Sequence, residues 1–381
     1  MEIESQSLHL PEEIIGEILP RLPVKSLLRL RCVSKSWHSL IGTERFIKKH
    51  HQNSMKNPSF TQQRFIIETN LLEWPKQCSL LSVLSGPINT IPFSPLAYPT
   101  NTTLFSRLAY PRNTTLPMGY DIVGSCNGLL CIVNDENIFH LWNPSTRIIS
   151  KKLPEISIVN DLDDFDNFGF GWVESSDEYK VFVNVVEWNS SVGEIYSTRT
   201  KSWKTIELCP YFIPFCREGL FGGGKLYWMY DDDEVIIFLD LKSEVFGRIE
   251  IPSDQEKMYG EIDREKYAID VGVLGGFVCV LCFNYQIRGY RVWVMNESWE
   301  EVVTLSHLLE LLQPPLVKGL NGEILVNCGS IVVVYDCRDN VFRNLKYCSC
   351  CEDTGFSSHG DCVDSSSHDV YVESLVWPED L

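Results

Sequence analysis

The sequence predicts a mainly β protein, in which three short amino-terminal helices precede a β-propeller of six blades, within a range of five to seven. After residue 120, short runs rich in β-branched and aromatic residues alternate with tight-turn residues, a pattern typical of all-β domains. The turns recur at intervals of 49, 47, 52, 46 and 47 residues, and propeller blades repeat about every 40 to 50 residues. These intervals are counted from the second residue of Asn127-Gly128, Ser176-Asp177, Gly223-Gly224, Gly275-Gly276, Asn321-Gly322 and His368-Asp369.

A second series of turns keeps the same phase and predicts a hairpin tip between the outer strands of each blade. The sixth repeat has room for only one strand, in the region 370–377. Strands from the region 60–117 are expected to complete that blade, because closing the ring removes an exposed sheet edge. The turns of the second series lie at 142–146, 197–203, 240–243, 296–299 and 336–339.

The amino-terminal residues predict short helices with one apolar stripe. Pro11 suits the first position of a helix, because it has no hydrogen bond to lose there. The apolar residues that follow share one helix face at the 3.6-residue period, namely Ile14, Ile15, Ile18, Leu19 and Leu22. Pro20 removes one helical hydrogen bond, so the first helix is expected to end early or to kink. A second helix is expected at 24–31, a third after the N-cap residue Ser34, and a fourth after Thr43.

These helices carry more apolar side chains than they can enclose by themselves. A unit shorter than about 40 residues usually needs outside support to be stable. Surplus apolar stripes on small helices predict a docking surface for another protein. The alternative is that the helices pack as a core against the rest of the chain.

Four ordered motifs in this stretch resemble the F-box in its plant form: Leu10-Pro11-Glu12-Glu13-Ile14-Ile15, Arg21-Leu22-Pro23-Val24-Lys25-Ser26-Leu27-Leu28, Cys32-Val33-Ser34-Lys35-Ser36-Trp37 and Leu40-Ile41. The resemblance implies a non-catalytic substrate-recognition subunit of an SCF-type E3 ubiquitin ligase. Its F-box would bind a Skp-type adaptor, and through it a cullin and a RING subunit. Carried over position by position, the resemblance implies adaptor contacts at Leu10, Pro11, Ile14, Ile15, Ile18, Leu22, Pro23, Val24, Leu27, Leu28, Val33 and Trp37.

The β region also resembles a known family, the plant F-box-associated domain, which is described in many relatives as kelch-like. The resemblance is carried by Asn127-Gly128-Leu129-Leu130-Cys131, Trp142-Asn143-Pro144-Ser145-Thr146, Gly169-Phe170-Gly171-Trp172 and Asp177-Glu178-Tyr179-Lys180-Val181. The expected organisation is an F-box at 4–50, a linker with ring-closing strands at 51–117 and the propeller at 118–381. Two alternative functions stay open. One is that of the similar pollen S-locus F-box proteins, which recognise ribonucleases, and the other is a propeller enzyme or carbohydrate binder with no ligase role.

Composition excludes several classes of partner. The net charge is −18, and residues 1–56 carry nine Lys/Arg against six Asp/Glu, so the acidic excess lies in the propeller half. Nucleic acid and anionic membranes repel such a surface, whereas a basic target protein is attracted. No apolar run reaches the roughly 18 residues of a membrane span. We therefore expect a protein of the cytoplasm, the nucleus or both, with 14 reduced cysteines.

No cluster of residues predicts catalysis, a cofactor or a metal. The acidic run Asp161, Asp163, Asp164 and Asp166 lacks the glycine of a calcium loop, so a solvated loop is expected there. Cys348, Cys350, Cys351, His359 and Cys362 lack the paired C-x-x-C spacing of structural zinc modules. Residues 96–104 recur as 108–116, which predicts a lengthened surface loop, with a duplicated binding loop as the alternative.

Overall fold

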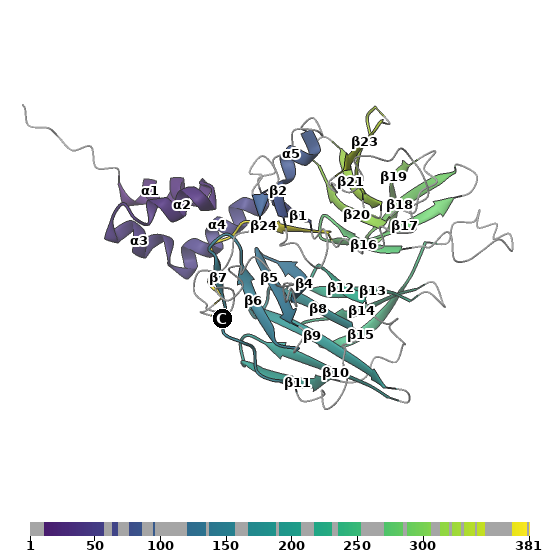
Figure 1. The fold of residues 1–381 in the computed structure, drawn as a ribbon, viewed down its shortest axis with the longest axis horizontal. Helices are drawn as coiled ribbons and strands as arrows, with labels where there is room; N and C mark the ends of the chain where they lie inside the picture. Colours follow the sequence, from purple (N-terminus) through teal and green to yellow (C-terminus); the bar gives the residue numbers. More distant parts are fainter. Residues whose placement is uncertain are drawn as a thin grey trace, which may run out of the picture.

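The computed structural model places a helical module beside a ring of β-sheets (Figure 1). It describes residues 11–56, 63–67, 76–85, 94–95, 120–134, 137–156, 167–187, 190–206, 217–230, 235–252, 270–284, 288–305, 313–319, 322–328, 331–339, 341–346, 368–378 and 381. The acidic run at 161–166, the repeat at 96–116 and the cysteine-rich stretch at 348–362 lie outside the described residues.

The helical module consists of α1 (Glu12–Ile18), α2 (Val24–Leu30), α3 (Lys35–Ile41) and α4 (Glu44–Lys56). Helix α1 ends early, as predicted, and a 3₁₀ turn (Leu19–Arg21) carries the chain through Pro20. Ser34 caps α3, because its Oγ accepts a hydrogen bond from the Trp37 amide at 3.2 Å. Thr43 caps α4 in the same way through the Phe46 amide at 3.3 Å.

Five blades of the ring are built from consecutive strands, each with four strands in sequence order. They are blade 1, with β4 (Tyr120–Cys126), β5 (Leu129–Asn134), β6 (Phe139–Asn143) and β7 (Ile148–Ile149); blade 2, with β8 (Asn167–Val173), β9 (Glu178–Glu187), β10 (Ser190–Ser197) and β11 (Ser202–Ile206); blade 3, with β12 (Arg217–Gly222), β13 (Lys225–Tyr230), β14 (Val235–Asp240) and β15 (Val245–Glu250); blade 4, with β16 (Asp270–Leu274), β17 (Phe277–Asn284), β18 (Gly289–Asn296) and β19 (Ser298–Leu305); and blade 5, with β20 (Gln313–Lys318), β21 (Glu323–Cys328), β22 (Ile331–Asp336) and β23 (Val341–Lys346).

The sixth blade joins the two ends of the chain and confirms the predicted ring closure. Its strands follow the order β24 (His368–Val372), β1 (Gln63–Ile67), β2 (Lys76–Ser79) and β3 (Ser94–Pro95), and helix α5 (Leu80–Ser85) follows β2 directly. Strand β24 pairs with β1 in antiparallel register. The first strands of successive blades are neighbours all round the ring, including β24 with both β20 and β4. The described strands therefore form six blades, as the turn spacing predicted.

The predicted turns at residues 127–128, 176–177, 223–224 and 275–276 join the first two strands of blades 1 to 4. At residues 127 and 128 the backbone has positive φ values of 51° and 81°, as the tight turns that match strand twist require. The prediction of a turn at His368-Asp369 is wrong, because both residues pair with β1 inside β24. In blade 6 the second strand comes from the other end of the chain, so no turn is needed at this place.

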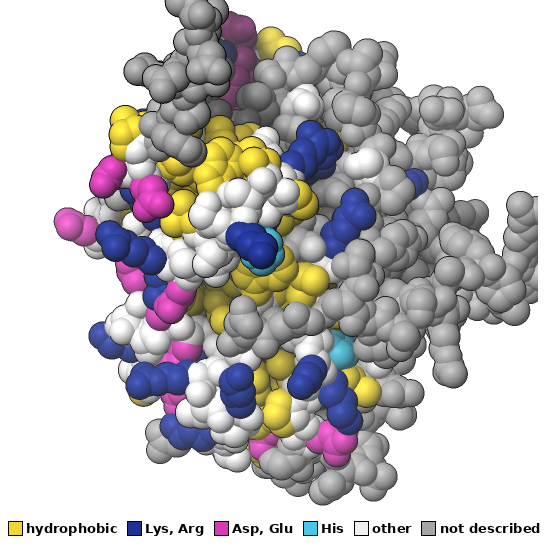
Figure 2. Space-filling model, turned by 90° about the vertical axis from the view of Figure 1, so that its left-hand side faces the viewer, with side chains coloured by type: hydrophobic (Ala, Val, Ile, Leu, Met, Phe, Trp, Pro, Cys, Tyr) yellow, Lys and Arg dark blue, Asp and Glu magenta, His cyan; other side chains and the backbone are white. Residues whose placement is uncertain are grey.

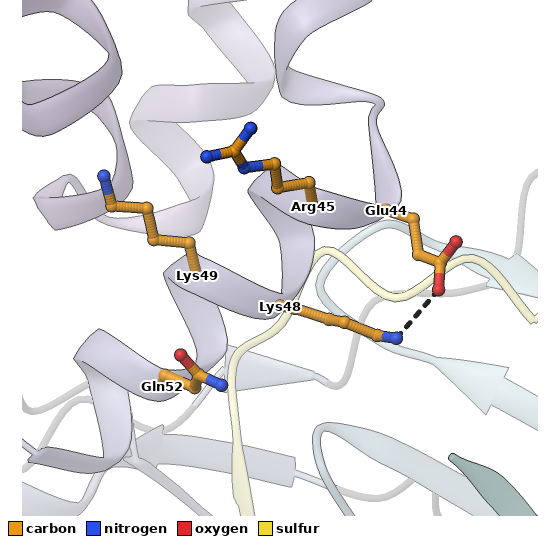
Figure 3. A pocket seen from close by; sticks show the side chains of 5 residues that line it. All are labelled: Glu44, Arg45, Lys48, Lys49 and Gln52. Carbon is orange, nitrogen blue, oxygen red and sulfur yellow. Dashed lines mark ion pairs between the residues drawn. The ribbon is translucent and has the colours of Figure 1, made fainter. Parts of the chain in front are cut away.

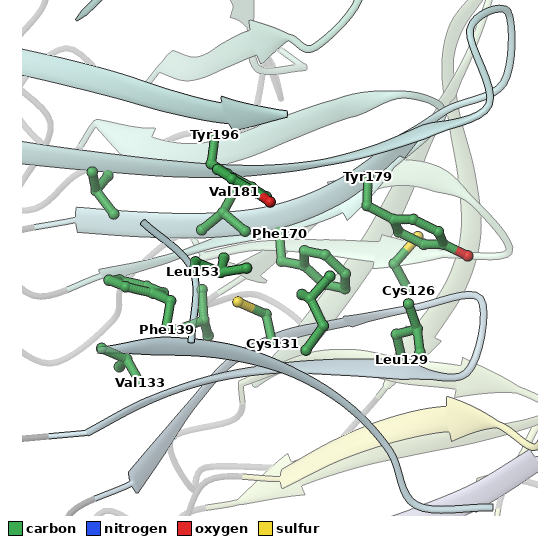
Figure 4. Packing of buried hydrophobic residues seen from close by; sticks show 13 residues of the cluster. Cys126, Leu129, Cys131, Val133, Phe139, Leu153, Phe170, Tyr179, Val181 and Tyr196 are labelled. Atoms are coloured by element: carbon green, nitrogen blue, oxygen red, sulfur yellow. The ribbon is translucent and has the colours of Figure 1, made fainter. Parts of the chain in front are cut away.

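The propeller core lies between neighbouring sheets. The cluster between blades 1 and 2 includes Phe139, Phe170 and Tyr179, whose side chains point between the two sheets (Figure 4). A repeated polar contact accompanies this packing at the outer strands. The indole nitrogen of Trp203 donates to the Pro154 carbonyl at 2.7 Å, and that of Trp299 donates to the Glu250 carbonyl at 2.8 Å. Trp203 thereby ties the outer strand of blade 2 to the chain that leaves blade 1, and Trp299 ties the outer strand of blade 4 to the end of the outer strand of blade 3.

Candidate functional site

The candidate site is the helical module, whose small core is closed by a residue from the other end of the chain. The helices bury Leu19, Val24, Leu27, Ile41 and Phe46 around one another. Leu375, which follows the last propeller strand, packs into the same cluster and is only 1% exposed. The module therefore receives part of its outside support from this segment, while other apolar side chains of the module stay exposed.

The structure distributes the predicted contact residues over three levels of exposure. Pro11, Ile14, Ile18, Pro23 and Val33 are exposed, and the exposed fractions of Ile14, Ile18 and Val33 are 44%, 47% and 64%. Four more are half-buried, namely Ile15, Leu22, Leu28 and Trp37. Leu10 lies outside the described residues. Figure 2 shows hydrophobic side chains gathered on the end of the molecule that carries the helices, with acidic and basic side chains around them.

Two of the predicted contact residues are not on the surface. Val24 is 1% exposed and Leu27 is fully buried, so neither side chain is available to a partner in this conformation. Both belong to α2, and their three-residue spacing places them on one face of that helix, which packs into the module's own core. These two of the expected contact residues therefore serve the module's own core.

Helix α4 attaches the module to the propeller. Lys48 forms an ion pair with Glu44 at 2.8 Å and a second one with Asp177, in the first turn of blade 2. Hydrogen bonds to these two carboxylates raise the pKa of Lys48. Lys49 donates to the carbonyl of Gly16 at 3.1 Å, which ties α4 back to α1. Among the described residues, those that line an open depression beside these lysines all belong to α4 (Figure 3).

Two adjacent histidines of α4 lie at the same junction. His50 is fully buried, and its Nε2 hydrogen-bonds to the Leu22 carbonyl at 3.1 Å. Within the part of the chain that the structure describes, its Nδ1 has no hydrogen-bond partner. Burial lowers the pKa of both His50 and His51, because a charged imidazole there would lose its hydration. A hydrogen bond to Leu22 for one and to Asn127 for the other opposes that shift.

The lowered pKa values of His50 and His51 predict that the folded protein loses stability in mild acid. A histidine whose pKa is lower in the folded state contributes fully above its unfolded pKa of about 6.5, and its contribution falls as the pH drops below that value. The unfolding free energy is expected to fall by up to about 1.4 kcal/mol per pH unit for each such histidine. Urea unfolding between pH 7.5 and 5.5 measures this slope. The double variant His50→Gln/His51→Gln should flatten it, and an unchanged slope would contradict the assignment.

A short stretch after β24, here called the C-terminal segment (residues 373–377), runs between α4 and the propeller strands (Figure 3). Asn143, at the end of β6, donates from Nδ2 to the carbonyls of Ser374 and Val376 at 3.1 and 2.8 Å, and to the Ser374 hydroxyl at 3.1 Å. The guanidinium carbon of Arg31 lies 4.5 Å from the centre of the Trp377 ring. No local sequence pattern predicts these contacts, because they join residues more than 200 positions apart.

The described residues show no constellation for chemistry. They contain no group of three or more His, Cys, Asp or Glu side chains that could hold a metal ion. Cys78, Cys126, Cys131, Cys279 and Cys282 of the propeller are buried. Burial raises the pKa of Cys78 and Cys279 to about 12, so these thiols stay protonated. None of the described helices is long and apolar enough to cross a membrane. What the described site offers is surface for protein contacts.

Comparison with known proteins agrees with this architecture. The F-box domain model matches residues 7–49, and the F-box associated beta propeller domain model matches residues 101–377. An F-box/kelch-repeat protein of Arabidopsis thaliana is 27% identical, with 98% of this chain and 97% of the relative covered. The F-box protein CPR1 of the same plant is 28% identical over 96% of this chain and 88% of its own length.

This pair of domains has a general role. An F-box implies binding to a Skp-type adaptor, and an F-box joined to such a propeller implies a substrate adaptor of an SCF complex, a kind of subunit that is typically non-catalytic. The propeller model alone matches well over half of the chain. This protein therefore belongs to the F-box proteins that carry an F-box-associated β-propeller domain.

Proposed function

We propose that this protein is the substrate-recognition subunit of an SCF-type E3 ubiquitin ligase in the cytoplasm or nucleus. Its F-box binds a Skp-type adaptor, which connects it to the cullin and RING subunits, and its propeller binds the protein to be ubiquitinated. The chain itself carries out no bond making. Transfer is accelerated because target and ubiquitin-loaded enzyme are held on one assembly, which raises their effective concentration.

The observation that carries this proposal is the exposure of the apolar side chains of Ile14, Ile18 and Val33 on the helical module. These three are among the most exposed large hydrophobic residues of the described chain. Ile14 and Ile18 are one helical turn apart on α1, so their side chains lie next to each other. No side chain of α1 is fully buried, although the neighbouring helices contribute several buried residues to the core. A helix with one face left uncovered is suited to complete an interface with another protein.

The proposed contact surface follows from these exposures. Side chains that reach the surface would contact the adaptor directly, namely Pro11, Ile14, Ile15, Ile18, Leu22, Pro23, Leu28, Val33 and Trp37, with Leu10 beside them. Val24 and Leu27 would act indirectly, because their burial sets the position of α2. Ile15, Leu22, Leu28 and Trp37 also pack against the helical core. Substitutions at the exposed residues Pro11, Ile14, Ile18, Pro23 and Val33 therefore separate adaptor affinity from folding most cleanly.

The double variant Ile14→Asp/Ile18→Asp is expected to weaken adaptor binding at least about 100-fold. Each isoleucine would contribute burial free energy to the interface, and each aspartate would add the cost of desolvating a charge. Binding of the purified full-length chain to a purified Skp-type adaptor, measured by isothermal titration calorimetry, provides the test. Both positions are near half exposed, so the variant is expected to fold normally.

Val245→Asp is the matched control for this experiment. Val245 is the first residue of β15 in the propeller, and its side chain is 57% exposed. It therefore carries the same change from an exposed aliphatic side chain to a carboxylate, at a site away from the helices. Its adaptor affinity should equal that of the unaltered chain. Adaptor binding by Ile14→Asp/Ile18→Asp that is as tight as that of the control would overturn the proposed docking surface.

A further inference from the structure

The C-terminal segment contacts the propeller and the F-box through alternate side chains. Ser374 and Val376 face the propeller, where Ser374 meets Asn143 and Val376 packs against the core between blades 1 and 2. Leu375 and Trp377 face the helices, where Leu375 enters the helical core and Trp377 lies against Arg31. Successive side chains of an extended backbone point to opposite sides, so one short segment can contact the propeller and the helical module at the same time.

Asn143 is the residue that holds this segment on the propeller side. It is fully buried, and its Nδ2 makes the three contacts with residues 374 and 376 described above. The Oδ1 atom of Asn143 makes a second set of hydrogen bonds, which it accepts from the amides of Ser145 and Thr146 at 2.9 and 3.3 Å. That second set of bonds forms the turn between β6 and β7.

The corresponding turns of other blades show which part of Asn143 is special to blade 1. In blade 3 the Oδ1 atom of Asp240 accepts from the amides of Lys242 and Ser243 at 3.0 and 2.9 Å. In blade 5 the Oδ1 atom of Asp336 accepts from the Arg338 amide at 2.9 Å. A carboxylate is sufficient to form this turn, but it has no hydrogen to donate. The amide of Asn143 forms the same turn and also donates to the C-terminal segment.

We propose that Asn143 is a positioning residue that clamps the C-terminal segment and thereby holds the F-box in one orientation on the propeller. This inference builds on the proposed function, because a fixed orientation determines where a bound target sits relative to the ubiquitin-loaded enzyme. Another contact supports the same junction. Lys48 of α4 forms an ion pair with Asp177 in blade 2. The C-terminal segment is the contact that enters the helical core itself.

Asn143→Asp tests the clamp with a minimal change of shape. The variant keeps the Oδ1 acceptor that forms the turn, and it replaces the donor by a carboxylate oxygen that faces two carbonyls. Hydrogen–deuterium exchange of the full-length chain, read by mass spectrometry, reports local opening. Exchange of the amides in residues 373–377 is expected to rise at least about tenfold. Asp240→Asn is the matched control, since it makes the reverse exchange at the equivalent turn and should leave residues 373–377 unchanged.

A second measurement reads the orientation itself. Small-angle X-ray scattering of the chain in complex with a purified Skp-type adaptor should show a larger radius of gyration and a broader distance distribution for Asn143→Asp than for the unaltered chain or for Asp240→Asn. Adaptor affinity should stay within about twofold of the unaltered chain, because Asn143 is not part of the docking surface. This combination distinguishes a positioning role from general unfolding.

Four outcomes are decisive. Unchanged exchange in residues 373–377 of Asn143→Asp would overturn the clamp, and so would equal effects in Asp240→Asn. Faster exchange with an unchanged scattering profile would overturn the orienting role. Failure of the unaltered chain to bind the adaptor would overturn the proposed function instead, and hydrogen–deuterium exchange of the chain alone would still decide whether the clamp exists.

Discussion

Replacing Trp228 by alanine is expected to lower the free energy of unfolding by about 3 to 5 kcal/mol. Trp228 is 1% exposed in β13 and packs edge-on against Phe182 of blade 2, with ring centroids 5.4 Å apart. The backbone at Gly219 packs closely against the indole ring of Trp228, because a Cβ atom added at Gly219 would lie 2.5 Å from that ring. Truncation would leave a cavity that this close-packed surface cannot fill, so the cost of the cavity adds to the lost burial.

Equilibrium urea unfolding monitored by far-ultraviolet circular dichroism measures this loss. Phe277→Ala is the control, because Phe277 is 47% exposed at the start of β17 and its removal is expected to cost within about 0.5 kcal/mol. A loss below about 1.5 kcal/mol for Trp228→Ala would show that blades 2 and 3 repack around the gap. The two blades would then be less tightly fitted than their shared eight-stranded sheet implies.

Gly128→Ala is expected to cost about 2 to 5 kcal/mol, for two reasons. The backbone φ at this position is +81°, where a side chain is strained. The added carbon would also lie 2.4 Å from the carbonyl oxygen of Val372 and from the hydroxyl oxygen of Ser374. The turn of blade 1 and the end of β24 would therefore have to separate.

Gly224→Ala separates these two causes. Gly224 occupies the equivalent turn of blade 3 with nearly the same φ, +80°, but a side chain there would meet nothing within 4 Å. Its cost should be the backbone strain alone, about 1 to 2 kcal/mol. Thermal and urea unfolding of both variants measure the difference. Equal losses for the two variants would mean that the close approach of β24 contributes nothing to stability.

The ring of blades could be predicted because its determinants are local and repeated. Turn residues such as Asn127 and Gly128 adopt the positive φ that short hairpins need, and their spacing reports the length of one blade. The missing strands of blade 6 were predicted from the need to leave no open edge. The turn predicted at His368-Asp369 is wrong, because residue types that are common in turns occur there inside a strand that pairs with β1.

The docking surface was predicted only in part. The F-box resemblance supplies the expected contact residues, but it does not say which of them the module uses for its own core, and Val24 and Leu27 are buried there. The role of Asn143 was beyond local reasoning for another reason. Its partners lie at residues 374 and 376, and nothing near residue 143 in the sequence distinguishes an amide that donates across the molecule from one that only shapes a turn.

The pairing of β1 with β24 also sets the order in which the chain can fold during synthesis. Strand β1 is made before the strands of the five other blades, whereas its neighbour β24 is made after them. Until then β1 presents a free edge to other nascent chains, and Leu375 is missing from the helical core. A product terminated before β24 would therefore lack both that strand and a complete F-box core. Cellular quality control would treat it as an incompletely folded protein.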